Sequence, residues 1–130
     1  MEYHKKLTII IISYKSEKKI NNFIKKIPKD IKVIIIENSN NLELKKNIEK
    51  KHKNIKVFIK TNDGVAASIN YAVKRIKTKY LLQISPDILF NFKQLNFFFK
   101  IAKKLNDKFS ALGPRFLNVE SKSHRQINSN

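Results

Sequence analysis

Four short polar segments hold most of the side chains in this sequence that could do chemistry. Each segment directly follows an apolar run that is typical of a strand, and in open α/β sheets the ligand lies outside the carboxyl ends of the strands. Carboxylates, an aromatic ring, hydroxyls and amides would then meet at one rim of a sheet. The alternative, equally supported by the pattern, is that they are ordinary loop and helix-capping residues. The segments are Ser13 with Tyr14, residues 37–39, residues 62–64 and residues 85–87.

Several common kinds of active site are excluded by composition. The chain has only two glycines, so it can form neither the G-x-G-x-x-G nor the G-x-x-x-x-G-K-[ST] phosphate-binding loop. It has no cysteine, which excludes disulfides, thiolate zinc sites and cysteine nucleophiles. Its three histidines are scattered without an H-x-x-x-H pair, and the serines have no visible general base. These features disfavour dinucleotide dehydrogenases and P-loop NTPases.

The elements that must position the polar segments alternate along the chain. Apolar, β-branched runs predict buried strands at residues 7–12, 33–36, 55–59 and 80–84, with a last strand-like piece at 110–112. Apolar residues three and four positions apart predict a helix after each of the four strands, and Pro28 is expected to stop the first helix. The apolar residues that define one face of each predicted helix are Ile20, Phe23, Ile24 and Ile27, then Leu44 and Ile48, then those within residues 65–76, and then those within residues 95–105.

This alternation predicts an α/β fold, a three-layer sandwich around a mostly parallel sheet with right-handed crossovers. We see no internal repeat and no linker. One domain over residues 1–119 is expected, followed by a polar tail at 120–130. A length of 130 residues with 42% hydrophobic residues suffices for one buried core.

The chain is strongly basic, but its composition argues against specific nucleic-acid recognition. Lys and Arg number 28 against 10 acidic residues, a formal charge of +18. Only three of these are Arg, the side chain preferred for bidentate contacts with bases and phosphates. The lysines are spread along every segment, so we expect nonspecific attraction to anionic membrane or RNA instead. No membrane span or signal peptide is apparent, which predicts a cytoplasmic location, peripheral to the membrane face where that attraction acts.

Five motifs follow one another in a recognisable order: LTIIIISYKS at 7–16, IIIENS at 34–39, NDGVAASIN at 62–70, YLLQISPD at 80–87 and LGPRFLN at 112–118. Each motif alone is weak. Their order resembles the N-terminal, donor-binding half of family 2 glycosyltransferases, of the rhamnosyltransferase-like type. The resemblance implies a GT-A fold, with a nucleotide-diphospho-sugar donor and inverting transfer to a glycan or lipid-linked acceptor of the cell envelope.

The resemblance also assigns roles to the last polar segment. Asp87 matches the last Asp of the family's D-x-D position, which implies contact with Mg²⁺ or Mn²⁺ and with the donor diphosphate, whose negative charge grows during transfer. The alternative role for Asp87 is capping of a helix after Pro86. Ser85 replaces the first acidic or amide residue of that position, so the metal would rest on one carboxylate, phosphate oxygens and water. Outside this segment, Asn70 of the third motif matches a later Asn of the family, but it is equally consistent with a polar position on a helix.

The other assigned residues would surround the nucleotide and the sugar. By the resemblance, Ser13 and Tyr14 line the nucleotide site, with the ring or backbone against the base. Glu37 takes the place of the family's usual Asp, which hydrogen-bonds the base or ribose, and its extra methylene shifts or removes that contact. Asn62 and Gly64 would shape the donor pocket, since glycine permits close backbone approach.

The resemblance leaves the catalytic step open. An inverting transferase needs a general base for the acceptor hydroxyl, and in the family this residue lies beyond the fifth motif, with the acceptor site. Only Glu120 remains there, without a supporting pattern, so no base is assigned. We therefore expect a truncated donor-binding half, or one completed by a partner chain or by self-association through an exposed sheet edge. The alternatives are a noncatalytic interaction module of degenerate glycosyltransferase fold and a basic nucleic-acid-binding domain.

Overall fold

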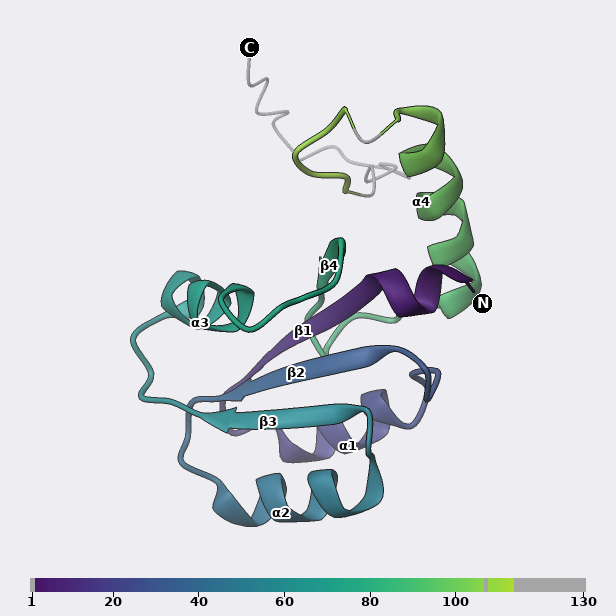
Figure 1. Cartoon of the computed structure of the whole chain (residues 1–130). Coiled ribbons are helices and arrows are strands. Elements are labelled where there is room, and N and C mark those ends of the chain that lie inside the picture. The colour runs from purple at the N-terminus through teal and green to yellow at the C-terminus, as the bar shows by residue number, and fades with distance from the viewer. Residues whose placement is uncertain (1, 107, 114–130) are drawn as a thin grey trace, which may run out of the picture.

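Four parallel strands form the sheet at the centre of the chain (Figure 1). The computed structural model describes residues 2–106 and 108–113. The strands are β1 (Leu7–Ser13), β2 (Lys32–Glu37), β3 (Ile55–Ile59) and β4 (Tyr80–Gln83), in the order β3-β2-β1-β4. Every pairing is parallel, as expected for strands joined by helical crossovers.

The register brings the carboxyl ends of three strands level with one another. Ser13 at the end of β1 lies beside Glu37, and Glu37 lies beside Ile59 at the end of β3. The edge strand β4 ends earlier, with Gln83 beside Ile10, although the backbone N–H of Ile84 still donates to the carbonyl of Ile10 at 3.1 Å. The loops after β1, β2 and β3 therefore leave the sheet from one rim.

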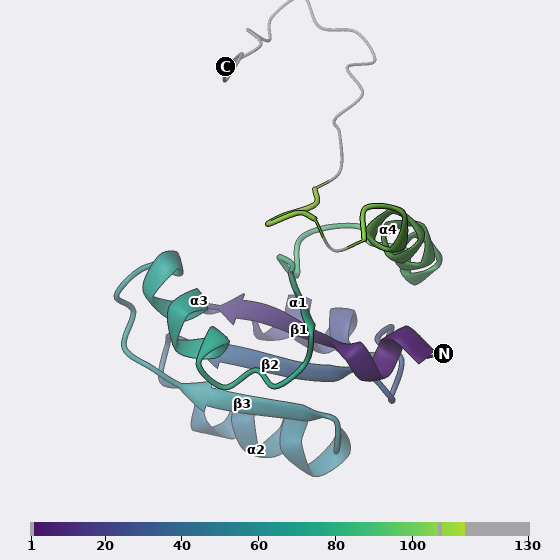
Figure 2. The same ribbon diagram turned by 45° about the horizontal axis from the view of Figure 1, so that its top comes forward.

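Helices cover the two faces of the sheet unequally (Figures 1 and 2). A short 3₁₀ helix, η1 (Glu2–Lys6), precedes β1. Apolar residues of α1 (Glu17–Ile24), α2 (Leu42–Lys51) and α4 (Phe92–Lys104) join one core cluster with the odd-numbered residues of β1, β2 and β3. The opposite face packs its smaller cluster, including Ile10 and Ile36, against α3 (Val65–Val73) through Ala72.

The predicted three-layer α/β fold with a parallel sheet is confirmed, and two details were wrong. Helix α1 ends at Ile24, before Pro28, because the backbone N–H groups of Lys26 and Ile27 close tighter turns on the carbonyls three residues earlier. Residues 110–112 form no strand, and β4 has no second strand partner among the described residues. The predicted tail at 120–130 lies outside those residues. Within 2–106 and 108–113, no helix has the length and hydropathy to cross a bilayer.

Candidate functional site

The loops after β1 and β2 are joined to each other by two hydrogen bonds. The N–H of Asn38 donates to the carbonyl of Ser13 at 2.8 Å, and the N–H of Lys15 donates to the hydroxyl of Ser39 at 3.2 Å. Lys15 has a φ of 50°, in the left-handed region, which turns the chain sharply from β1 toward α1. The structure thus brings two of the predicted site residues, Ser13 and Glu37, together at the rim.

Glu37 is buried and uses its carboxylate inside its own loop. Its Oε2 accepts hydrogen bonds from the backbone N–H groups of Ser39 at 3.0 Å and Asn41 at 2.8 Å, and its Oε1 accepts from the Ser39 hydroxyl. Asn41 in turn caps α2 by accepting from the N–H of Leu44 at 2.9 Å. Glu37 therefore fixes the shape of the loop at the rim, and its contact with a nucleotide stays a prediction.

Two buried oxygen atoms beside this loop lack hydrogen-bond partners among the described residues. They are Ser13 Oγ and Asn38 Oδ1. The amide nitrogen of the same Asn38 donates to Ser68 Oγ at 2.8 Å, which ties the end of β2 to α3. Most buried polar atoms in proteins are paired, so a pair of unpaired ones at adjacent strand ends marks a place where polar partners are needed.

Tyr14 follows the buried Ser13 and turns outward. Its side chain is half-exposed, and the Nζ of Lys15 lies 5.4 Å from the centre of its ring. An accessible ring beside a cation offers an apolar surface together with a positive charge. This placement is compatible with the predicted role of Tyr14 in the nucleotide site.

The loop between β3 and α3 is exposed and contains a glycine with a positive φ. Gly64 has φ 95° and ψ 167°, a conformation that residues with a side chain rarely adopt, and it caps α3. Asn62 is exposed in the same loop, whereas Asn70 lies exposed further along α3. No side-chain hydrogen bond among the described residues joins Asn62 or Asn70 to the rest of the rim.

Asp63 is a third carboxylate at this rim, and its interactions hold it in the ionised form. It accepts hydrogen bonds from Lys60 Nζ at 2.5 Å and from the Thr61 hydroxyl at 3.0 Å. These bonds, with the charge of Lys60, hold the pKa of Asp63 below its usual value. A general base works best with a pKa near the working pH. Asp63 is therefore poorly suited to deprotonate an acceptor hydroxyl.

The loop after β4 reaches back to α1 through an exposed ion pair. Lys19 Nζ lies 2.5 Å from Asp87 Oδ1, and the two side chains are 62% and 59% exposed. Asp87 is not the residue that caps α4, because Asn91 accepts from the N–H of Lys93 at 2.9 Å in that role. Ser85 accepts at 3.4 Å from the N–H of Asp87. The Asp87 carboxylate is thus an accessible group that the fold itself does not use as a helix cap.

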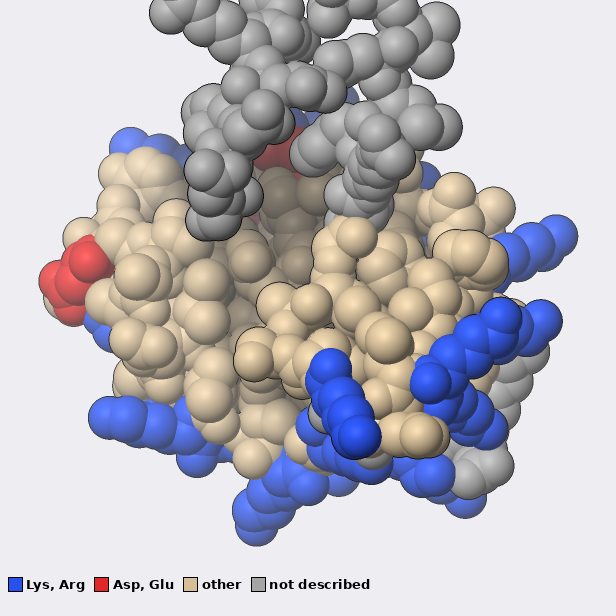
Figure 3. Space-filling view, turned by 90° about the horizontal axis from the view of Figure 1, so that it is seen from above, with Lys and Arg blue, Asp and Glu red and all other residues tan. Residues whose placement is uncertain are grey.

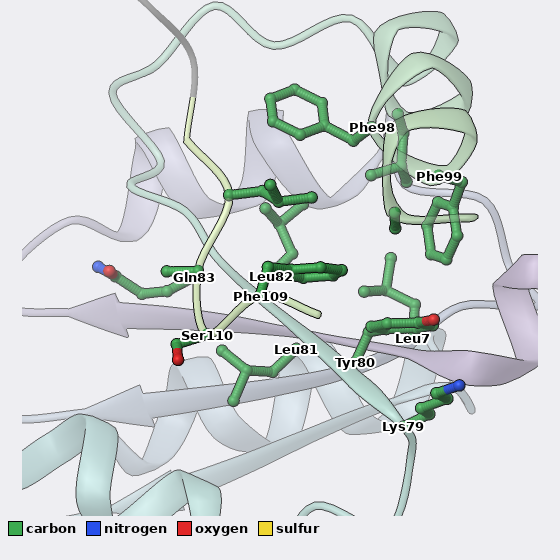
Figure 4. A pocket seen from close by; sticks show the side chains of 14 residues that line it. Leu7, Lys79, Tyr80, Leu81, Leu82, Gln83, Phe98, Phe99, Phe109 and Ser110 are labelled. Carbon is green, nitrogen blue, oxygen red and sulfur yellow. The ribbon is translucent and has the colours of Figure 1, made fainter. Parts of the chain in front are cut away.

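A cavity among the described residues lies away from this rim. It has a volume of about 610 Å³ and is lined by β4, α4 and residues 109–112 (Figure 4). Leu82, Phe98, Phe99 and Phe109 give it an apolar lining, and none of the predicted site residues takes part.

Comparison with known proteins decides the family. The family model described as Glycosyl transferase family 2 matches residues 8–127. The chain belongs to glycosyltransferase family 2. The resemblance to family 2 glycosyltransferases inferred from the five motifs is thereby confirmed. A search of curated proteins gave no match.

A solved structure supports the same fold for this family 2 chain. The crystal structure of residues 1–349 of TarS from S. aureus is similar to it with a TM-score of 0.64 and 21% sequence identity. The similarity covers 78% of this chain and 33% of the TarS chain. The fold is therefore GT-A-like, and the chain spans about a third of that neighbour.

Three contributors to the rim had not been assigned roles from the sequence. Lys19 is one lysine among many, and nothing in its spacing distinguishes it. Ser68 lies within an alanine-rich stretch where a serine carries no special signal. Asn38 belongs to a polar segment that the sequence did place at the rim, but its bond to α3 depends on how α3 packs on the sheet.

Proposed function

We propose that this chain binds a nucleotide-diphospho-sugar at the rim formed by the ends of its strands, as the donor half of an inverting glycosyltransferase. Membership of family 2 supports transfer of a glycosyl group as the general function. The observation that carries the donor site is Asp87: an exposed carboxylate, not used as a helix cap, held at the rim by a single exposed lysine. The acceptor half would come from outside these residues, because the similarity spans only a third of TarS.

The side chains present suit a cation shared with the donor, and not one held by protein alone. Among the residues described, no three His, Cys, Asp or Glu side chains lie together. Mg²⁺ commonly binds through one or two carboxylates plus substrate phosphates and water. Asp87, with the hydroxyl of Ser85 close to its own backbone, fits this arrangement. A bound Mg²⁺ or Mn²⁺ would offset the charge that develops on the leaving diphosphate.

The remaining residues would hold the donor in place. Tyr14 offers a ring for the base, and Ser13 and Asn38 hold polar atoms beside it. Gly64 and Asn62 would leave room for backbone approach to the sugar, since Gly64 has no side chain and open space around it. Lys19 carries a positive charge next to Asp87 and could meet a phosphate when Asp87 binds a cation.

Calorimetric titration of the chain with UDP and with dTDP, each with and without Mn²⁺, tests the proposal. We expect saturable binding that needs the metal. In Asp87→Asn the affinity should fall about ten- to a hundredfold, because one charge-assisted contact is worth about 1.5–3 kcal/mol. Asn keeps the shape of Asp, so the melting temperature should not change.

Asp30→Asn is the matched control. Asp30 is also a half-exposed carboxylate with a side-chain partner, the Nδ1 of His4 at 2.7 Å, but it precedes β2 and so lies at the amino ends of the strands. Nucleotide affinity should be unchanged in this variant. Unchanged affinity in Asp87→Asn would remove the donor-site assignment, and absence of any metal-dependent binding in the unmodified chain would favour a noncatalytic interaction module.

A further inference from the structure

Helix α4 carries a surface that the proposed donor site does not use. Its residues Phe92–Lys104 include four lysines and no acidic residue, whereas Leu42–Lys51 of α2 also has four lysines but two glutamates. An α-helix turns about 100° per residue. Four residues therefore share one side of α4, which we call the basic–aromatic face: Lys93, Phe97, Lys100 and Lys104.

The basic–aromatic face points away from the core. Leu95 and Ala102, on the opposite side of the helix, are buried in the fold. Phe97 is 65% exposed, in contrast to Phe92 and Phe99, which pack against the core. An exposed phenylalanine among lysines exposes apolar area to water, and such patches commonly mark interaction sites.

A basic hollow adjoins this face. It has a volume of about 440 Å³ and lies between η1, the start of β4 and the second half of α4. Four lysines contribute to its wall, and no Asp or Glu occurs among the described residues that line it. In Figure 3 the side chains of Lys and Arg project along most of the border of the molecule, including the side on which α4 lies. The lysines of the hollow are Lys6, Lys79, Lys100 and Lys103.

The position of the hollow relative to the donor site is informative. Its wall includes Lys6 and Lys79, which directly precede β1 and β4, so it lies at the amino ends of these strands. The proposed donor site lies at the carboxyl ends. A partner on α4 would therefore leave the rim open to a nucleotide.

We propose that the basic–aromatic face of α4 docks this chain on an anionic phospholipid bilayer. The lysines would meet lipid phosphates, and Phe97 would enter the interface between headgroups and acyl chains, as in other interfacial helices. Single-stranded nucleic acid is bound by rows of stacked rings and favours arginine, and this face has one ring and no arginine.

Sedimentation with lipid vesicles tests this proposal without any nucleotide. The full chain should bind vesicles of equal parts phosphatidylglycerol and phosphatidylcholine, and not vesicles of phosphatidylcholine alone. Each lysine near an anionic surface changes the partition coefficient about fivefold. The double variant Lys100→Gln with Lys104→Gln should therefore bind about 25-fold more weakly. Phe97→Ser should bind about five- to tenfold more weakly, through loss of its apolar area.

The controls are matched in chemistry and placed on α2. Lys46→Gln with Lys50→Gln removes the same charge from an exposed helix surface, and Leu42→Ser removes a side chain that is 57% exposed. We expect clearly smaller losses in both. Equal losses in the α2 and α4 variants would overturn the proposal in favour of diffuse charge attraction. Weakened binding of an RNA oligonucleotide in the α4 variants, with vesicle binding unchanged, would overturn it in favour of nucleic acid.

Discussion

The rim of the sheet consists of two halves that are built in different ways. At the ends of β1 and β2, Ser13, Glu37 and Asn38 are buried, and Glu37 and Asn38 are fixed by hydrogen bonds within the fold. After β3 and β4, Gly64 and Asp87 are exposed, and Asp87 is held by one exposed ion pair. The first half is thus preorganised, because hydrogen bonds within the fold hold its loop in one conformation. The second half can exchange its partners for those of a ligand.

Removing the Glu37 carboxylate should show the largest effect on stability. Glu37→Ala leaves the N–H groups of Ser39 and Asn41 without their acceptor, and we expect a loss of about 3 kcal/mol in the free energy of unfolding. Urea denaturation measures it. Glu43→Ala, at an exposed position in the first turn of α2, should lose only about 0.5 kcal/mol. Similar losses in the two variants would contradict a preorganised half of the rim.

The tie between β2 and α3 should have the next largest effect. Ser68→Ala leaves the buried amide nitrogen of Asn38 without an acceptor, so we expect a loss of about 2 kcal/mol. Ser16→Ala removes a hydroxyl that is not buried and donates only to the carbonyl of Tyr14, and should lose less than about 0.5 kcal/mol. A chemical denaturation series with both variants decides whether the tie contributes as argued.

In the exposed half of the rim, a substitution at Gly64 should lower stability through backbone conformation alone. In Gly64→Ala the new methyl group meets no atom within 4 Å, so the loss of about 1–2 kcal/mol comes from the positive φ. Gly113→Ala is the control, because it also meets open space but has no positive φ in the strained range. Its melting temperature should match that of the unmodified chain. A loss in Gly113→Ala equal to that in Gly64→Ala would refute the conformational explanation.

The smallest expected effect is the pH dependence of stability that Asp63 contributes in the exposed half of the rim. Lys60 and Thr61 lower the pKa of Asp63 in the folded state. Their hydrogen bonds therefore stabilise the fold fully at pH values above the pKa that Asp63 has in the unfolded chain. This stabilisation is lost as the pH falls through the pKa of Asp63 in the folded chain. In Lys60→Met the pKa of Asp63 should rise toward its usual value, as an NMR titration would show. The stabilities of the two proteins should differ near neutral pH and converge in acid. His4→Gln should leave the titration of Asp63 unchanged.

The sequence predicted the sheet well because burial on both faces selects β-branched residues in unbroken runs. The isoleucines of β1 and β2 are nearly all buried, and each run predicted its strand within one residue or two. The same pattern failed at 110–112, because a short apolar piece becomes a strand only where a neighbouring strand bonds to it. Local sequence does not contain that information.

The candidate site was predicted in outline, as a set of polar segments at strand ends. The sequence did not predict which of these residues form pairs. Lys19 and Asp87, for example, meet only after four strands have assembled. Glu37 shows a second limit: its residue type predicted an acidic contact, but its hydrogen bonds to its own loop follow from a turn geometry that residue type alone does not specify. Roles of single residues toward the donor remain predictions.

The strand order has a consequence for how the chain assembles. β1 lies between β2, whose pairing begins at Thr8 with Lys32, and β4, whose pairing begins at Leu7 with Tyr80. Contacts distant in sequence require larger loops to close and form more slowly. We therefore expect β1, β2 and β3 to fold first, and β4 to complete the sheet last. Amide hydrogens of β4 should then exchange fastest among the strands, and the Asp87 loop would take its place at the rim in the final step of folding.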